Sequence, residues 1–151
     1  MKLGFWRFLF LFIFSFAVLS RSEAGEQHIA ILDFRGIGID KNNLPILAAQ
    51  SRAAAAAVLN SEGYIVITRE NMLQILEDMG KDISCIDGLC EVEIGRNIGA
   101  DYIVVGDVIK IEGQYVLTLQ LYSTGSGALL SSMDVQDSSV LGLKNKDFSG
   151  F

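Results

Sequence analysis

Apolar and polar residues alternate between strand-like and helix-like patterns from residue 28 onward. Residues 28–34 (HIAILDF) form an almost continuous apolar run, which is typical of a strand buried on both faces. Residues 35–43 carry glycine and asparagine, so we expect a loop there. Apolar residues then recur at helical spacing over residues 44–59, with Asn43 as the expected cap and Pro45 in the first turn. The pattern predicts a strand, a loop and a helix.

The alternation continues through the middle of the chain. Residues 64–68 are a short β-branched strand, and residues 70–79 have the apolar spacing of a second helix, which Gly80 ends. A short third helix is expected over residues 91–98. Because strands joined by a helix normally lie parallel, the first two strands should be parallel neighbours with a right-handed crossover.

The C-terminal half has the two-residue period of strands. A long strand is expected over residues 102–111, Glu112-Gly113 is a two-residue hairpin turn, and residues 114–123 alternate cleanly. A glycine-rich turn leads into a last strand over residues 128–134. The prediction is an α/β fold of three layers, with a mixed five-stranded sheet in which a βαβα unit is followed by an antiparallel meander.

The first 24 residues have the pattern of a secretory signal peptide. Lys2 and Arg7 precede an apolar run over residues 8–19, and Ser22-Glu23-Ala24 fits a cleavage site. The run has 12 residues, and a helix needs roughly 20 to span a bilayer. An uncleaved membrane anchor is the alternative.

The expected organisation is therefore a signal peptide over residues 1–24, one domain over residues 25–134 and a polar tail over residues 135–151. The tail has one small apolar cluster, at Val140, Leu141 and Leu143. Since no cysteine precedes Cys85, the chain has no cysteine for N-terminal lipidation. We expect a periplasmic or secreted protein without stable membrane insertion after cleavage.

The composition of the chain limits the partners and the kinds of site that we expect. Half of the 151 residues are apolar and only one is proline, which predicts a packed core. The net charge is −6, and removal of residues 1–24 leaves 9 basic and 17 acidic side chains, net −8. An acidic surface without a basic patch argues against nucleic acid and anionic lipid as partners. With one histidine and two cysteines, we assign no catalytic residue, no metal ligand and no cofactor.

Cys85 and Cys90 are the sharpest chemical feature. An even number of cysteines in an exported protein favours a disulfide, which would close a small loop containing an Asp-Gly pair. A redox-active pair is the alternative, although such pairs typically have the C-x-x-C spacing.

Polar residues near the strand ends are weaker candidates. Gly36-Ile37-Gly38 follows the first strand but lacks the rest of a phosphate-binding motif. Asp33, Asp101 and Asp107 could hold a divalent ion together, but the pattern favours a turn for Asp101 and a solvated face for Asp107. His28 is most simply an exposed or edge residue.

The last strand ends the meander, so we expect it near an edge of the sheet. It carries no lysine, arginine or proline, the residues that commonly block pairing of an edge with another chain. An interaction edge is therefore expected at four apolar residues: Ala128, Leu129, Leu130 and Met133. The alternative is that residues 135–151 fold back and cover this edge.

Four segments resemble an envelope family that groups the amino-terminal domain of TolB, the curli-secretion lipoprotein (CsgG-like) and outer-membrane lipoprotein activators of penicillin-binding proteins. They are IAILDF at residues 29–34, TRE at 68–70 followed by Met72-Leu73 and Ile75-Leu76, CEVEIGRNIGADYIVVG at 90–106, and LTLQLYS at 117–123 with Gly125. The resemblance implies a three-layer α/β domain without a catalytic site, which acts in envelope assembly through protein contacts.

The resulting hypothesis is a non-enzymatic periplasmic protein-interaction module in envelope assembly or secretion. Its partners would be envelope proteins. Assembly into a homo-oligomer is a further alternative. One alternative is a small-ligand or nucleotide-binding domain that uses the crevice at Asp33 to Asp40. Another alternative is a thiol-redox protein that uses Cys85 and Cys90.

Overall fold

The computed structural model describes residues 25–80 and 90–144. In chain order these residues form β1 (Gln27–Ile31), β2 (Arg35–Ile37), α2 (Asn43–Leu59), the 3₁₀ turn η1 (Asn60–Glu62), β3 (Tyr64–Ile67), α3 (Arg69–Asp78), α4 (Cys90–Asn97), β4 (Tyr102–Ile111), β5 (Gln114–Ser123), β6 (Leu129–Asp137) and α5 (Val140–Lys144).

The strands form one mixed sheet with the order β3-β1-β4-β5-β6. β1 lies parallel to both β3 and β4, whereas β4, β5 and β6 form an antiparallel meander. This arrangement confirms the predicted mixed α/β fold. It has one more strand than expected, because β2 also pairs with β4.

The expectation of a loop throughout residues 35–43 is wrong for its first three residues. β4 is ten residues long, and β1 pairs only with its first part, Tyr102 to Val104. β2 pairs in parallel with Asp107 to Ile109 on the same side of β4. It therefore supplies backbone partners that β1 does not reach.

The helices begin close to the predicted positions. α2 has Pro45 in its first turn, as expected, but Asn42 rather than Asn43 precedes the helix and makes no side-chain cap bond. Thr68 caps α3, because its hydroxyl oxygen accepts a hydrogen bond from the Asn71 N–H at 3.3 Å.

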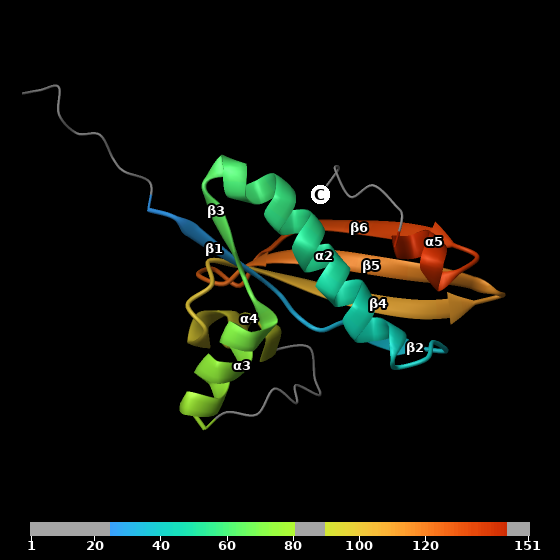
Figure 1. Ribbon diagram of the computed structural model, residues 1–151, viewed down its shortest axis with the longest axis horizontal. Coiled ribbons are helices and arrows are strands. Elements are labelled where there is room, and N and C mark those ends of the chain that lie inside the picture. Colours follow the sequence, from blue (N-terminus) through green and yellow to red (C-terminus); the bar gives the residue numbers. More distant parts are fainter. Residues whose placement is uncertain (1–24, 81–89, 145–151) are drawn as a thin grey trace, which may run out of the picture.

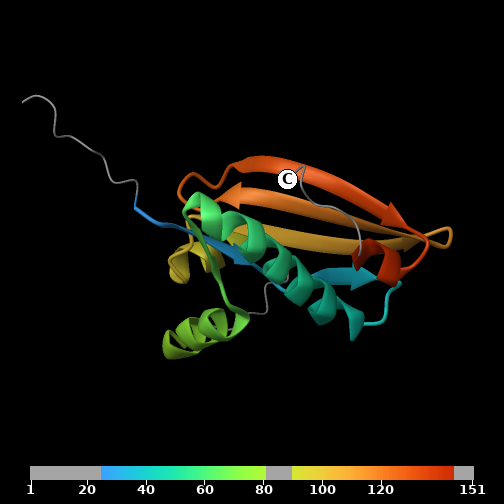
Figure 2. The same ribbon diagram turned by 45° about the horizontal axis from the view of Figure 1, so that its top comes forward.

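Two hydrophobic clusters lie on opposite faces of the sheet. Helices cover each cluster, so the fold has three layers (Figure 1). On one face, alternate residues of β1, β4 and β5 pack against α2 and α5. On the other face, the intervening residues of β1 and β4 pack against α3 and α4. The turned view shows that α2 crosses one face of the sheet and that α3 lies apart from this face (Figure 2).

The chain after residue 134 continues as regular structure. β6 extends to Asp137, and α5 follows, where a polar tail was expected. Leu143 is fully buried in the cluster below α2. A single buried leucine in a short polar stretch gives little periodic signal, so the pattern did not predict this helix.

Candidate interaction surface

β6 is the last strand in the order of the sheet, which agrees with the expected edge position. No strand of the described ranges pairs with its outer side. Leu129 and Leu130 are 50% and 53% exposed, and Ala128 is exposed just before the strand. Met133 instead packs against the cluster below α2. The exposed apolar side chains of this edge are therefore concentrated at its first residues.

The pairing of β6 with β5 is irregular at one end. Tyr122 pairs with Leu129 and Leu121 with Ser131, so Leu130 is the extra residue of a bulge. From Ser131 to Asp137 the register is regular. α5 packs on the face of the sheet beside β6 and α2 (Figure 1). In the described part of the expected tail, residues 135–137 therefore complete β6, and α5 lies on the face of the sheet.

Asp33, just after β1, binds two arginines from opposite layers. Arg52 of α2 donates to Asp33 Oδ1 and, at 2.9 Å, to the carbonyl oxygen of Ile31. Arg69 of α3 donates to Asp33 Oδ2 at 2.8 Å. Burial alone would raise the pKa of the Asp33 carboxyl, but hydrogen bonds and positive charge from Arg69 and Arg52 outweigh burial and lower this pKa below its usual value.

Sequence reasoning did not identify Arg52, whose side chain is only 9% exposed. The signal was present, because Arg52 follows Ala48 by four residues and so falls on the apolar face of α2. A charge on such a face needs a partner. The chain provides one in Asp33.

A second ion-pair cluster joins β2, β4 and α4. Arg35 donates to Asp107 Oδ1 at 2.9 Å and to Glu91 Oε1 at 2.7 Å. The hydrogen bond with Asp107 raises the pKa of Arg35 above its ordinary value, although burial by itself would lower this pKa. Glu91 is 5% exposed, and its Oε2 has no hydrogen-bond partner among the described residues. These contacts fix α4 over the sheet.

The three aspartates singled out in the sequence lie in three separate places. Asp101 precedes β4, as expected for a turn, and its Oδ2 accepts a hydrogen bond from the His28 N–H at 2.8 Å. His28 itself is in β1, an inner strand, with a half-exposed side chain. Asp33 and Asp107 are bound by arginines. In the described ranges no group of three or more acidic, histidine or cysteine residues could hold a metal ion.

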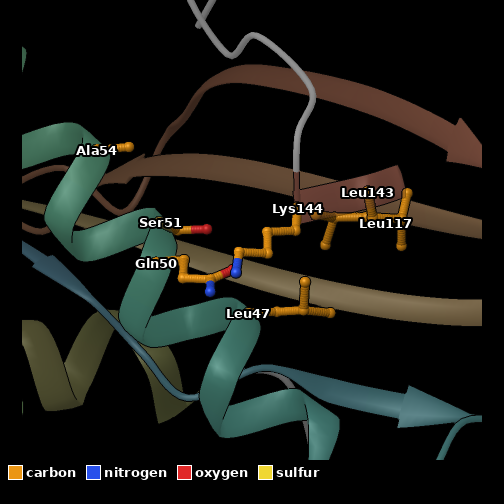
Figure 3. Close-up of a pocket in the computed structure, with 7 residues that line it drawn as sticks. All are labelled: Leu47, Gln50, Ser51, Ala54, Leu117, Leu143 and Lys144. Carbon is orange, nitrogen blue, oxygen red and sulfur yellow. The ribbon is translucent and has the colours of Figure 1, made fainter. Parts of the chain in front are cut away.

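The crevice expected at Asp33 to Asp40 does not have the form of a phosphate loop. Gly36 lies within β2 and Gly38, with φ of 75°, turns the chain after it. A separate small cavity of about 60 Å³ lies between α2, β5 and α5 (Figure 3). Leu47, Gln50 and Lys144 are among its lining residues. Pockets for drug-sized ligands have volumes of roughly 300 Å³ or more, so this cavity is too small for a nucleotide.

The cysteine prediction falls partly on undescribed residues. Cys90 is the first residue of α4 and is half-buried, whereas Cys85 lies outside the described residues. Their pairing stays a prediction. Among the helices that the structure describes, none is both long and apolar enough to cross a membrane.

Comparison with known proteins identifies the fold. No protein-family model and no curated protein sequence matches the chain. The C-terminal domain of LpoB from Salmonella enterica superposes with a TM-score of 0.56 at 15% identity, covering 83% of this chain and 92% of that one. The C-terminal domain of LpoB from Escherichia coli superposes with a TM-score of 0.56 at 15% identity, covering 84% of this chain and 93% of that one. The lipoprotein GNA1162 from Neisseria meningitidis superposes with a TM-score of 0.56 at 17% identity, covering 77% of this chain and 88% of that one.

These likenesses define a class of fold. The chain has the mixed α/β fold of the LpoB C-terminal domain and of GNA1162. This confirms, at the level of architecture, the fold that the resemblance implied. At 15–17% identity the likeness establishes the fold, and the function has to be argued from this chain's own surface.

Proposed function

We propose that this protein is a non-enzymatic envelope protein that binds an extended segment of another envelope protein along β6. The observation that carries this proposal is that β6 is the last strand of the sheet and that no strand in the described part of the chain pairs with its outer side. The fold shared with the LpoB domain and GNA1162 supports a place in the envelope.

Strand addition uses the backbone as the main source of affinity. An edge strand presents unpaired N–H and C=O groups that a second chain can extend as a further strand. β6 has nine residues, none of them lysine, arginine or proline. The exposed Leu129 and Leu130 add an apolar contact at one end of the ladder. Specificity would come from these side chains and affinity from the ladder.

Proline substitutions at two adjacent serines test the ladder. Successive N–H groups of a strand point to opposite sides, so of Ser131 and Ser132 one N–H faces β5 and the other faces outward. Proline at the first removes a hydrogen bond to β5, whereas proline at the second removes only an outward N–H. Chemical denaturation identifies the outward position as the variant that keeps its midpoint. We expect that variant to fold and to lose partner binding.

Partner binding is measured by photo-crosslinking in intact producing cells. A photoreactive amino acid at Leu129 should give a discrete crosslinked product, which the outward proline abolishes. The same amino acid at Ile46, an exposed residue of α2 on a helical layer, is the matched control and should give none. An undiminished product in the well-folded proline variant would refute strand addition at β6.

The envelope location is a separate part of the proposal. We expect the mature chain to begin near Gly25, after Ser22-Glu23-Ala24. N-terminal sequencing of the protein from the envelope fraction measures this directly. A retained Met1 would make the protein membrane-anchored through its first segment, without affecting the test of β6.

A further inference from the structure

The helical layer formed by α3 and α4 covers only part of its face of the sheet. Its cluster contains residues of β1, β3 and the beginning of β4, with Tyr122 of β5 beside it. α3 and α4 lie near one end of the sheet, whereas β2 and the β4–β5 hairpin lie at the other end (Figure 1). α4 reaches this second end only through Glu91, which binds Arg35 at the beginning of β2. Beyond that contact, the described helices leave apolar side chains of this face exposed.

Four apolar side chains lie together on this uncovered area. Ile37 pairs with Ile109 across β2 and β4, and Ile109 is opposite Val116 of β5. Ile111 follows two residues after Ile109, so it points to the same side. We call Ile37, Ile109, Ile111 and Val116 the isoleucine patch. The three isoleucines are 71%, 41% and 54% exposed, respectively.

The direction of these side chains follows from their neighbours. Val108 is fully buried in the cluster below α2, so Ile109 must point to the opposite face. A Cβ at Gly36 would meet Leu44 of α2, so Ile37 also points away from α2. The patch is therefore on the face that α3 and α4 cover elsewhere.

Acidic residues border the isoleucine patch. Asp107 and Asp134 lie in the next row of the sheet, paired in register through Thr118, and Glu112 is in the turn directly after Ile111. The described strands contain two basic residues, Arg35 and Lys110. Arg35 is bound by Asp107 and Glu91, and Lys110 lies over the Tyr115 ring at 4.9 Å. The border thus has an excess of negative charge.

We propose that the isoleucine patch binds a basic amphipathic helix of a partner protein, which completes the layer formed by α3 and α4. The patch spans β2, β4 and β5, and three strands spaced about 4.8 Å apart are roughly 10 Å wide, which is about the diameter of one helix. The apolar stripe of such a helix covers the patch, and its lysines or arginines face the acidic border. A second copy of this chain fits poorly, because it would place one acidic border against another.

A model peptide tests this recognition with a defined probe. We would titrate the exported protein into a labelled amphipathic peptide of leucine and lysine, about 18 residues or 27 Å of helix, and follow fluorescence anisotropy. The comparator has glutamate in place of every lysine. We expect binding of the lysine peptide that weakens with salt, and little binding of the glutamate peptide.

Two sets of variants locate the site. Ile37→Ser with Ile111→Ser should weaken binding about tenfold or more, whereas Ile46→Ser, at a residue 54% exposed on α2, should leave it unchanged. Asp134→Asn with Glu112→Gln should weaken binding severalfold and reduce its salt dependence. The asparagine amide oxygen can still accept the hydrogen bond that the Thr118 hydroxyl donates to Asp134, so this variant tests charge.

Several results would overturn the proposal. Equal binding by the patch variant would place the peptide elsewhere, and equal binding of both peptides would remove the role of the acidic border. A dimer that the patch substitutions dissociate would make a second copy the occupant. If the wild type binds no peptide and the patch variant is clearly less stable, this chain's own residues cover the patch. The proline variants of β6 are not involved, and Asp134→Asn leaves every backbone group of β6 in place, so this test fails or succeeds independently of strand addition.

Discussion

Asp33 shows how one residue connects the three layers. Its carboxylate lies at the end of β1 and receives Arg52 from one helical layer and Arg69 from the other. Arg52 is nearly buried, so its charge needs this partner more than the half-exposed Arg69 does. The cluster therefore stabilises the relative position of α2 and α3 at one point of the sheet.

We expect Asp33→Asn to lower the free energy of unfolding by about 2 kcal/mol at pH 7. The carbonyl of asparagine can still accept one hydrogen bond, but the buried Arg52 loses its counter-charge. Urea denaturation measures the change, with Glu77→Gln as an exposed control that should shift the midpoint little.

The loss should depend on pH in one direction. The folded-state pKa of Asp33 is below its unfolded value, so its contribution is complete above the unfolded pKa of about 3.9. It disappears as pH falls through the folded-state pKa. The stability difference between wild type and Asp33→Asn should shrink in acid, and a constant difference from pH 7 to pH 2 would contradict the ionic explanation.

Elements with a strong periodic pattern were predictable, whereas two short elements, β2 and α5, were not. The limits of β4 and β5 agree with the sequence pattern, since ten alternating or apolar residues leave little ambiguity. β2 has three residues. It forms because the second half of β4, about 70 positions later in the chain, needs backbone partners. α5 depends on one buried leucine. Neither element is long enough to give a periodic pattern.

Leu143 should be essential to α5 although the helix has only five residues. Its side chain is fully buried, so Leu143→Ala should lower the free energy of unfolding by about 2–4 kcal/mol. Leu141→Ala in the same helix is the control, because Leu141 is 66% exposed. Equal midpoints for both variants in chemical denaturation would mean that α5 does not contribute to the core.

Cys85 and Cys90 are expected to form a disulfide in the exported protein. Intact mass should increase by two hydrogens after reduction. Replacing both with serine should lower stability by about 2 kcal/mol and leave the fold intact, because the closed loop is short. Two freely alkylatable thiols in protein taken directly from the envelope would exclude the bridge, and a reactive thiolate at neutral pH would favour the redox alternative.

At the scale of the whole molecule, the sequence predicted the layers but only part of the site. The alternation of strands and helices was sufficient for the mixed sheet and the edge position of β6. The isoleucine patch was not predictable, because it consists of residues from β2, β4 and β5 that become neighbours only through the register of the sheet. Its exposure depends on where α3 and α4 end, which local patterns do not fix.

The two hydrophobic clusters should unfold together, because they share the same strands. Ile29 and Ile31 of β1 belong to the cluster below α2, and Ala30 between them belongs to the cluster at α3 and α4. Leu76 of α3 is 2% exposed, so Leu76→Ala should cost about 2–4 kcal/mol. The loss should also reach the opposite layer, since β1 cannot lose one face and keep the other.

Hydrogen exchange measures this coupling. In the Leu76→Ala variant the slowest amides of β5, far from the substitution, should exchange faster by the factor that corresponds to the global loss of stability. Met79→Ala, a substitution at an exposed residue just after α3, is the control and should leave these amides unchanged. If β5 keeps its protection in Leu76→Ala while α3 loses its own, the α3 layer unfolds as a separate unit. The edge strand β6 would then be available for pairing even when that layer is open.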